Sequence, residues 1–230
     1  MTVDYAYKYI LWQMNKNQAG SLSATEFGYL YNSEQLAFTN DLLGAWQKNN
    51  NSKQGNLTGL IENQTILNKL APCTFEIDLE FVNGYTKTPP KYLYNLGLLR
   101  NDYKMFYLTK DQIFNLKKDV IDAPSIANNI YYFTDLYSNI ASATFERYFY
   151  SYPAFTGIAK LWYVGKPDDV LWNFTIVAGR QVYNQTGSQN PIWDDITAQE
   201  ICNRCLKKLG VHFKDGDFVN YGNSVIQTAN

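Results

Sequence analysis

The chain has 230 residues, a formal net charge of -1 and a hydrophobic fraction of 46%, which is enough apolar material for a sizeable folded core. The balanced charge argues against a nucleic-acid-binding surface that spans the whole chain, because such a surface needs an excess of Lys and Arg. No stretch approaches the roughly 20 apolar residues of a membrane span, and the first residues do not have the pattern of a secretory signal. The aromatic fraction of 16%, with 19 Tyr, is high, and aromatic residues are enriched at protein interfaces.

Helical periodicity dominates the first third of the chain. Apolar residues recur at helical spacing in residues 2–14, about 24–46 and about 57–70, which predicts three helices. The polar, aperiodic stretch 47–56 predicts a mobile surface loop between the second helix and the third.

The start of the second helix has a capping-box sequence. Ser23 is the expected N-cap and Glu26 follows three residues later, with Leu22 and Phe27 placed as a hydrophobic staple. The same stretch also matches the ligand spacing of a calcium-binding loop, with Asn15, Asn17, Gly20, Leu22 and Glu26. Capping is the favoured interpretation, because a calcium site needs carboxylates from several residues and Glu26 is the only charged residue at these ligand positions.

The period changes to two in the middle of the chain. Apolar residues alternate with Glu76, Asp78 and Glu80, which predicts a half-buried strand over 75–81 with one acidic face, and Asn83-Gly84 predicts a hairpin turn. Pro89-Pro90 breaks the chain before an apolar run over 92–99, and further strands are predicted at 103–108, 130–133, 144–150 and 158–164. Thr109 and Gln112 form a second capping box before a short helix.

The last part of the chain returns to helices. Residues 172–177 predict a strand or an extended arm, and 178–192 a loop-rich segment. A helix begins at Asp195 or Thr197 and ends before Gly210, and a final helix spans about 217–228.

This order of elements predicts an α+β fold with an N-terminal helical bundle, a central antiparallel β-sheet region and C-terminal helices. The regions are 1–72, 73–192 and 193–230. The last is expected to pack back on the first, so that all three form one structural unit.

The number of cysteines and histidines would suffice for a zinc site, but their spacing does not favour one. Cys73, Cys202, Cys205 and His212 make up a Cys3His set by count. However, Cys202 and Cys205 fall on the apolar face of a predicted helix, and a zinc ribbon uses two paired knuckles. We predict core packing for these thiols, with no metal and no cofactor.

No catalytic motif stands out, and we predict that the protein is not an enzyme. The acidic pairs Asp168-Asp169, Asp194-Asp195 and Asp215/Asp217 lie at turns or helix starts, where Asp accepts backbone N–H bonds. His212 is the only histidine, without a nucleophile motif beside it, and no phosphate-binding glycine motif is present.

Several short anchors resemble one family. Asn15-Lys-x-Gln-x-Gly20 lies between two helices, and Tyr152-Pro153, the strand 158–164, Lys166-Pro167, Trp172 and Leu209-Gly210-Val211 follow in order. This pattern is similar to head–tail ring or connector proteins of crAss-like and related short-tailed phages. The resemblance spans most of the chain but is loose outside the anchors.

The resemblance implies a virion structural protein at the head–tail junction. Its partners would be copies of itself in a ring, twelve by the resemblance, and the portal or adjacent tail ring proteins. Phage DNA would pass through the channel without sequence-specific binding, and no membrane would be involved. The candidate subunit-interface residues are Asn49, Asn50, Asn51, Tyr183, Asn184 and Trp193.

An alternative is a soluble aromatic-rich module that binds glycans or a receptor, because Trp and Tyr rings stack on sugars. The five Trp are dispersed, and their apolar surroundings place most of them in the core.

Overall fold

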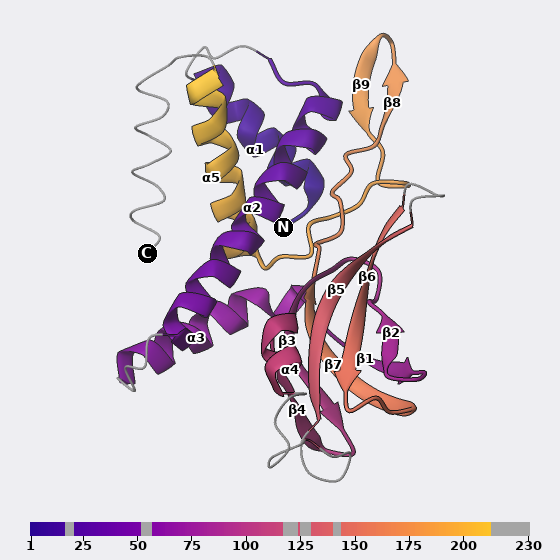
Figure 1. Ribbon diagram of the computed structural model, residues 1–230. Coiled ribbons are helices and arrows are strands. Elements are labelled where there is room, and N and C mark those ends of the chain that lie inside the picture. The colour runs from indigo at the N-terminus through magenta and orange to yellow at the C-terminus, as the bar shows by residue number, and fades with distance from the viewer. Residues whose placement is uncertain (17–20, 52–56, 117–123, 125–129, 140–143, 213–230) are drawn as a thin grey trace. The chain divides into compact units, whose positions relative to one another are not determined.

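The computed structural model describes residues 1–16, 21–51, 57–116, 124, 130–139 and 144–212. The chain folds as two compact units, Met1–Cys73 with Pro167–Asn230, and Thr74–Lys166. We call them the helical unit and the sheet unit. Figure 1 shows the elements of both.

The helical unit is built on α1 (Val3–Lys16), α2 (Ala24–Asn51), α3 (Leu57–Leu70) and α5 (Asp195–His212). It also contains the 3-10 turn η1 (Ala71–Cys73) and a hairpin of β8 (Phe174–Val177) and β9 (Arg180–Tyr183). Helices α1, α2 and α5 pack together in Figure 1. Their facing sides bury an apolar core that includes Ile10, Met14, Phe27, Tyr31, Phe38, Ile201, Cys202, Cys205 and Leu206.

The expected caps form at the helix starts. The Ser23 amide donates to Glu26 Oε2 at 2.8 Å and the Glu26 amide donates to Ser23 Oγ at 3.3 Å, so both members of the box are engaged. Asp194 caps α5, since its Oδ1 accepts the Thr197 amide at 2.8 Å. These bonds satisfy backbone donors that a helix cannot pair internally.

Side-chain amides on α2 hold the segment that returns from the sheet unit. Asn32 accepts the Val170 amide at 2.7 Å and donates to the Val170 carbonyl at 3.1 Å. Gln35 donates to the Asp168 carbonyl at 2.9 Å and accepts the Trp193 indole N–H at 3.2 Å. These amides satisfy polar groups that packing against α2 would otherwise leave unpaired.

The sheet unit is a seven-stranded sheet in the order β1-β7-β3-β4-β5-β6-β2. Its strands are β1 (Thr74–Phe81), β2 (Tyr85–Lys87), β3 (Tyr92–Arg100), β4 (Tyr103–Tyr107), β5 (Tyr131–Asn139), β6 (Thr144–Tyr152) and β7 (Gly157–Gly165). A bridge between Val82 and Tyr85 joins the ends of the order, so the sheet is nearly closed. Helix α4 (Lys110–Leu116) follows β4 and begins at the Thr109–Gln112 box, whose two bonds measure 2.9 and 3.3 Å.

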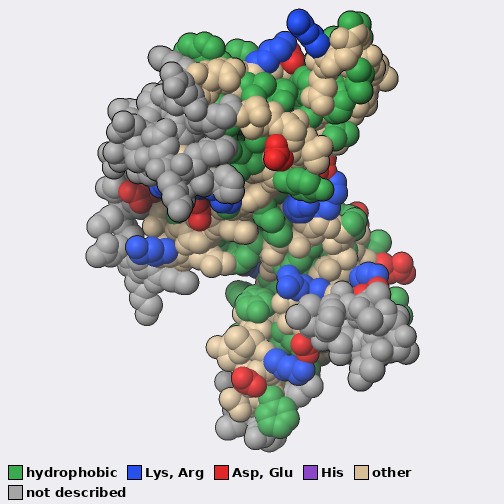
Figure 2. Space-filling model, turned by 90° about the horizontal axis from the view of Figure 1, so that it is seen from above, with side chains coloured by type: hydrophobic (Ala, Val, Ile, Leu, Met, Phe, Trp, Pro, Cys, Tyr) green, Lys and Arg blue, Asp and Glu red, His purple; other side chains and the backbone are tan. Residues whose placement is uncertain are grey.

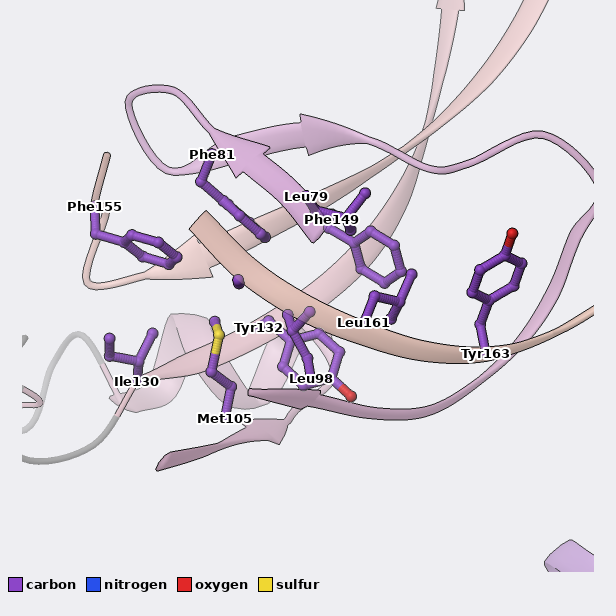
Figure 3. Close-up of a cluster of buried hydrophobic side chains, with 11 residues drawn as sticks. Leu79, Phe81, Leu98, Met105, Ile130, Tyr132, Phe149, Phe155, Leu161 and Tyr163 are labelled. Carbon is purple, nitrogen blue, oxygen red and sulfur yellow. The ribbon is translucent and has the colours of Figure 1, made fainter. Parts of the chain in front are cut away.

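The interior of the sheet unit is apolar (Figure 3). Side chains from six strands and the adjoining loops meet there, including Leu79, Phe81, Leu98, Met105, Ile130, Tyr132, Phe149, Phe155, Leu161 and Tyr163. The alternating pattern of the strands explains this arrangement, because every second side chain of a strand points to one face.

The α+β composition is as expected, but several details differ from the sequence analysis. Residues 47–51 continue α2 instead of opening a loop, and α5 runs on to His212. Gln and Lys are good helix formers. Lys48 in the last turn also stabilises the helix, because its positive charge lies near the negative end of the helix dipole.

The division of the chain also differs. Residues 167–192, which we assigned to the β region, belong to the helical unit, and 180–183 form a strand. In the sheet, β4 pairs with β5 in parallel, so the sheet is only mostly antiparallel. The predicted helix at about 217–228 lies outside the described residues.

We expect Ser23→Ala to lower the free energy of unfolding by about 1 kcal/mol, because the Glu26 amide loses its acceptor and the reciprocal box opens. Urea unfolding followed by circular dichroism measures the change. Gln47→Ala, at an exposed position of the same helix, is the control and should change stability little. Equal effects of the two substitutions would contradict the capping role.

Candidate functional site

The hairpin of β8 and β9 is the most distinctive surface feature of the helical unit. We call residues 174–183 the arm. Its strands pair from Phe174 with Tyr183 to Val177 with Arg180, and Ala178 and Gly179 form the turn with φ of 49° and 77°. Two positive φ angles define the turn type whose twist matches a two-stranded hairpin, and Gly179 adopts its angle without steric cost.

The base of the arm rests on one buried tryptophan. Trp172 is 6% exposed, and its ring lies 5.8 Å from the Phe174 ring and 5.9 Å from the Tyr183 ring. The other neighbour of the indole is Tyr7 of α1, at 4.6 Å, and the indole N–H donates to Asp4 Oδ1 at 3.2 Å. The first residue pair of the arm is therefore fixed to the helical core.

A hydrogen-bonded loop after β9 strengthens this base. Asn173 donates from Nδ2 to the Thr186 carbonyl at 2.8 Å and accepts the Asn184 amide on its own carbonyl at 2.9 Å. Gly187 has φ +84°, and a Cβ at that position would lie 2.9 Å from Asn173 Nδ2. Glycine is thus required both by its backbone angle and by the close approach of Asn173.

Beyond this base the arm is exposed on both faces. Ile176 is 71% exposed on one face, while Val177 and Val182 are 56% and 45% exposed on the other. Within the described part of the chain, β8 and β9 pair only with each other. An isolated two-stranded hairpin is marginally stable in water, so the anchored base is what allows these apolar residues to be presented to solvent.

A second exposed feature lies on the outer face of the sheet unit. Trp162 of β7 is 43% exposed, and its ring lies over Gly97 of β3, where an added Cβ would lie 3.9 Å from the indole Cε3. The indole N–H donates to Glu76 Oε2 at 2.5 Å, and Lys160 Nζ lies 2.8 Å from Glu76 Oε1. The hydrogen bonds from Lys160 and then Trp162 lower the pKa of Glu76.

The thiols belong to the core. Cys73, Cys202 and Cys205 are buried and unpaired with one another, and burial raises the pKa of Cys73 and of Cys202 to about 12. Such thiols are poor nucleophiles at neutral pH. The described residues include no group of three or more His, Cys, Asp or Glu side chains placed to hold a metal ion.

The predicted interface residues lie in different places and differ in exposure. Asn49 is half-buried in α2 and donates to Glu62 Oε2 at 3.4 Å. Asn50 and Asn51 belong to the same helix, and their side chains lie outside the description. Tyr183 and Asn184 are half-buried at the base of the arm.

Trp193 does not lie on the surface of the helical unit. It is 3% exposed, with its ring edge-on to Phe38 at 5.6 Å and its N–H bonded to Gln35. Its polar tip is satisfied inside the core, which is why an amphipathic side chain can be buried there.

The exposed residues of the arm and Trp162 were not singled out from sequence. Ala178-Gly179 is a weak hairpin signal, and the exposure of Trp162 depends on strand pairing. Trp12 is also exposed, at 58%, so two of the five Trp lie on the surface.

The face shown in Figure 2 carries Lys, Arg, Asp and Glu side chains interspersed, without a continuous field of one sign. None of the described helices is long and apolar enough to cross a lipid bilayer. Neither the protein-family models nor the curated protein sequences contain a match to this chain.

We expect the fluorescence of Trp162 to report the titration of Glu76. Because the pKa of Glu76 is lowered, the carboxylate keeps the indole hydrogen bond below the pH at which an ordinary glutamate protonates. The bond is lost as the pH falls through the lowered value. The difference between the pH titrations of the wild type and Trp162→Phe isolates this signal.

Glu76→Gln is the matched control, since an amide does not titrate and the transition should disappear. A transition of the Trp162 signal at or above the ordinary glutamate pKa would contradict the arrangement around Glu76.

Proposed function

We propose that the protein is a structural subunit that assembles with copies of itself into a closed ring, and that the arm is its principal assembly contact. The observation that carries this proposal is the contrast within the arm. Its base is held by Trp172 and a network of hydrogen bonds, whereas Ile176, Val177 and Val182 are exposed. A rigidly presented apolar element is suited to a partner surface, because little conformational freedom is lost when it binds.

By the resemblance described above, the ring would lie at the head–tail junction of a short-tailed, crAss-like phage virion. The ring would link the portal to the tail and line the channel through which DNA leaves. The balanced net charge of -1 suits a channel wall that DNA passes without being held. The role is structural, with no reaction and no cofactor.

Negative-stain imaging with mass determination, on purified protein with and without its cognate portal, tests this function. We expect rings, alone or on the portal, with twelve copies. Val177→Asp combined with Val182→Asp should abolish them, because charged groups at an apolar contact must be desolvated.

Gln47→Glu adds a negative charge at a polar, exposed position of α2 outside the arm and is the control, which should still assemble. Circular dichroism verifies the fold of both variants. A wild-type protein that stays monomeric with portal present, or a Val177/Val182 variant that assembles normally, would contradict the proposal.

The outer face of the sheet unit favours a second candidate function, the binding of glycans. Exposed Trp162 presents a ring face, and Glu76 and Lys160 beside it offer a hydrogen-bond acceptor and a donor. Sugar rings present apolar C–H faces and edges of hydroxyl groups, which match this combination.

For this second function we expect Trp162→Ala to abolish binding on a glycan array, because the stacking surface is removed. Trp162→Phe keeps an aromatic face and should retain part of the binding. An array without a wild-type signal, or a signal unaffected by Trp162→Ala, would exclude this function for Trp162.

A further inference from the structure

Strand β1 stands at one end of the described strand order of the sheet unit. Strand β1 pairs with β7 along its whole length, from Thr74 with Val164 to Phe81 with Gly157. On its other side, the bridge between Val82 and Tyr85 is the one pairing with β2 among the described residues. The backbone groups of β1 that face away from β7 before this bridge therefore have no described strand beside them.

The protection of this edge against strand addition is limited to its acidic row, Glu76, Asp78 and Glu80. Natural edge strands carry charged side chains, especially Lys, or Pro, or contain a bulge that twists them away. β1 reads Thr-Phe-Glu-Ile-Asp-Leu-Glu-Phe, without Lys or Pro, and its register with β7 is unbroken. Because β1 has no bulge in its pairing with β7, its other side can accept a further strand.

The two faces of β1 differ sharply near the edge. Phe75 and Ile77 lie on the same face as the core residues Leu79 and Phe81, but they remain 42% and 38% exposed. The opposite face carries the acidic row Glu76, Asp78 and Glu80. An added strand would meet an apolar surface on one face and negative charge on the other.

The arm carries one basic residue, on the face that also bears the exposed Val177 and Val182. Ile176 and Gln181 pair with each other and share one face, while Val177 and Arg180 pair and share the other. Arg180 is the only charged residue between Asp169 and Asp194. Suppose that β8 lies beside β1 as an added strand. If the side chain of Ile176 then lies on the same sheet face as Phe75 and Ile77, Arg180 lies on the opposite face, with the acidic row.

We propose that β8 of one copy adds to the open edge of β1 in the next copy. The inference rests on the proposed function and names its contact. Backbone hydrogen bonds supply affinity, while Ile176 against Ile77 and Arg180 toward Asp78 set the register. The arm and the edge are different surfaces, so the contact passes from copy to copy and generates a ring when the rotation closes.

Mixed single-cysteine variants test this contact directly. One chain carries Ile77→Cys and the other Ile176→Cys, and the two are mixed under assembly conditions and oxidised. The native cysteines are buried, so the introduced thiols dominate. We expect a disulfide-linked dimer of the two different chains, seen by non-reducing electrophoresis and mass spectrometry.

Ile158→Cys replaces Ile77→Cys in the control. Ile158 is 63% exposed and pairs with Glu80, so it lies on the outer face of β7, away from the open edge. It should cross-link to Ile176→Cys much less. Equal cross-linking at Ile77 and Ile158 would overturn the inference.

The outcomes separate this inference from the ring itself. Rings without the Ile77–Ile176 cross-link overturn the arm-to-β1 contact and leave the proposed function standing. A cross-link that forms within one chain of an Ile77→Cys, Ile176→Cys double variant, and not between chains, also overturns it. If neither rings nor cross-links form, both the proposed function and this inference are contradicted.

A charge exchange is an independent check on the register. Arg180→Glu should weaken assembly about threefold, the size of effect that an exposed charge pair has on an equilibrium constant. Asp78→Lys in the same chain should restore it, because each copy supplies an arm and an edge. Rescue that fails while both variants remain folded contradicts the placement of Arg180.

Discussion

The buried ring of Trp172 is the interaction on which the arm depends. It packs on Tyr7 of the first helix, bonds to Asp4, and lies beside both residues of the first arm pair. Without this contact the arm would be an isolated two-stranded hairpin, which is only marginally stable in water. With it, the helical core determines where the exposed Ile176, Val177 and Val182 are held.

The sheet unit presents the opposite feature, an edge along which no described strand pairs. Its seven strands curl until β1 and β2 meet at one bridge, and this leaves most of β1 unpaired on one side among the described strands. One unit of the chain thus offers a projecting pair of strands and the other an accepting strand. A single chain with both features can associate repeatedly through the same contact.

Much of the fold follows from the sequence, because its signals are local. Capping residues Ser23 and Thr109 mark helix starts, and the alternation of 75–81 marks a strand. The parallel pairing of β4 with β5 and the membership of 167–192 in the helical unit depend on contacts between residues far apart in sequence. Those contacts leave no periodic pattern.

The candidate site shows the same limit. Tyr183 and Asn184 were selected for polarity and glycine content nearby, and they lie at the base of the arm. Trp193 was also a candidate interface residue, yet Gln35 accepts its indole N–H inside the core. Burial of an amphipathic ring depends on a partner that the sequence does not identify.

Hydrogen–deuterium exchange across the arm, measured on the dispersed protein and on the assembled ring, tests the central claim most directly. The account predicts that the arm amides not bonded within the hairpin exchange rapidly in the dispersed protein and are strongly protected after assembly, because these backbone groups gain a partner strand. Exchange in the arm that is the same in both states, in rings that have demonstrably formed, would contradict it.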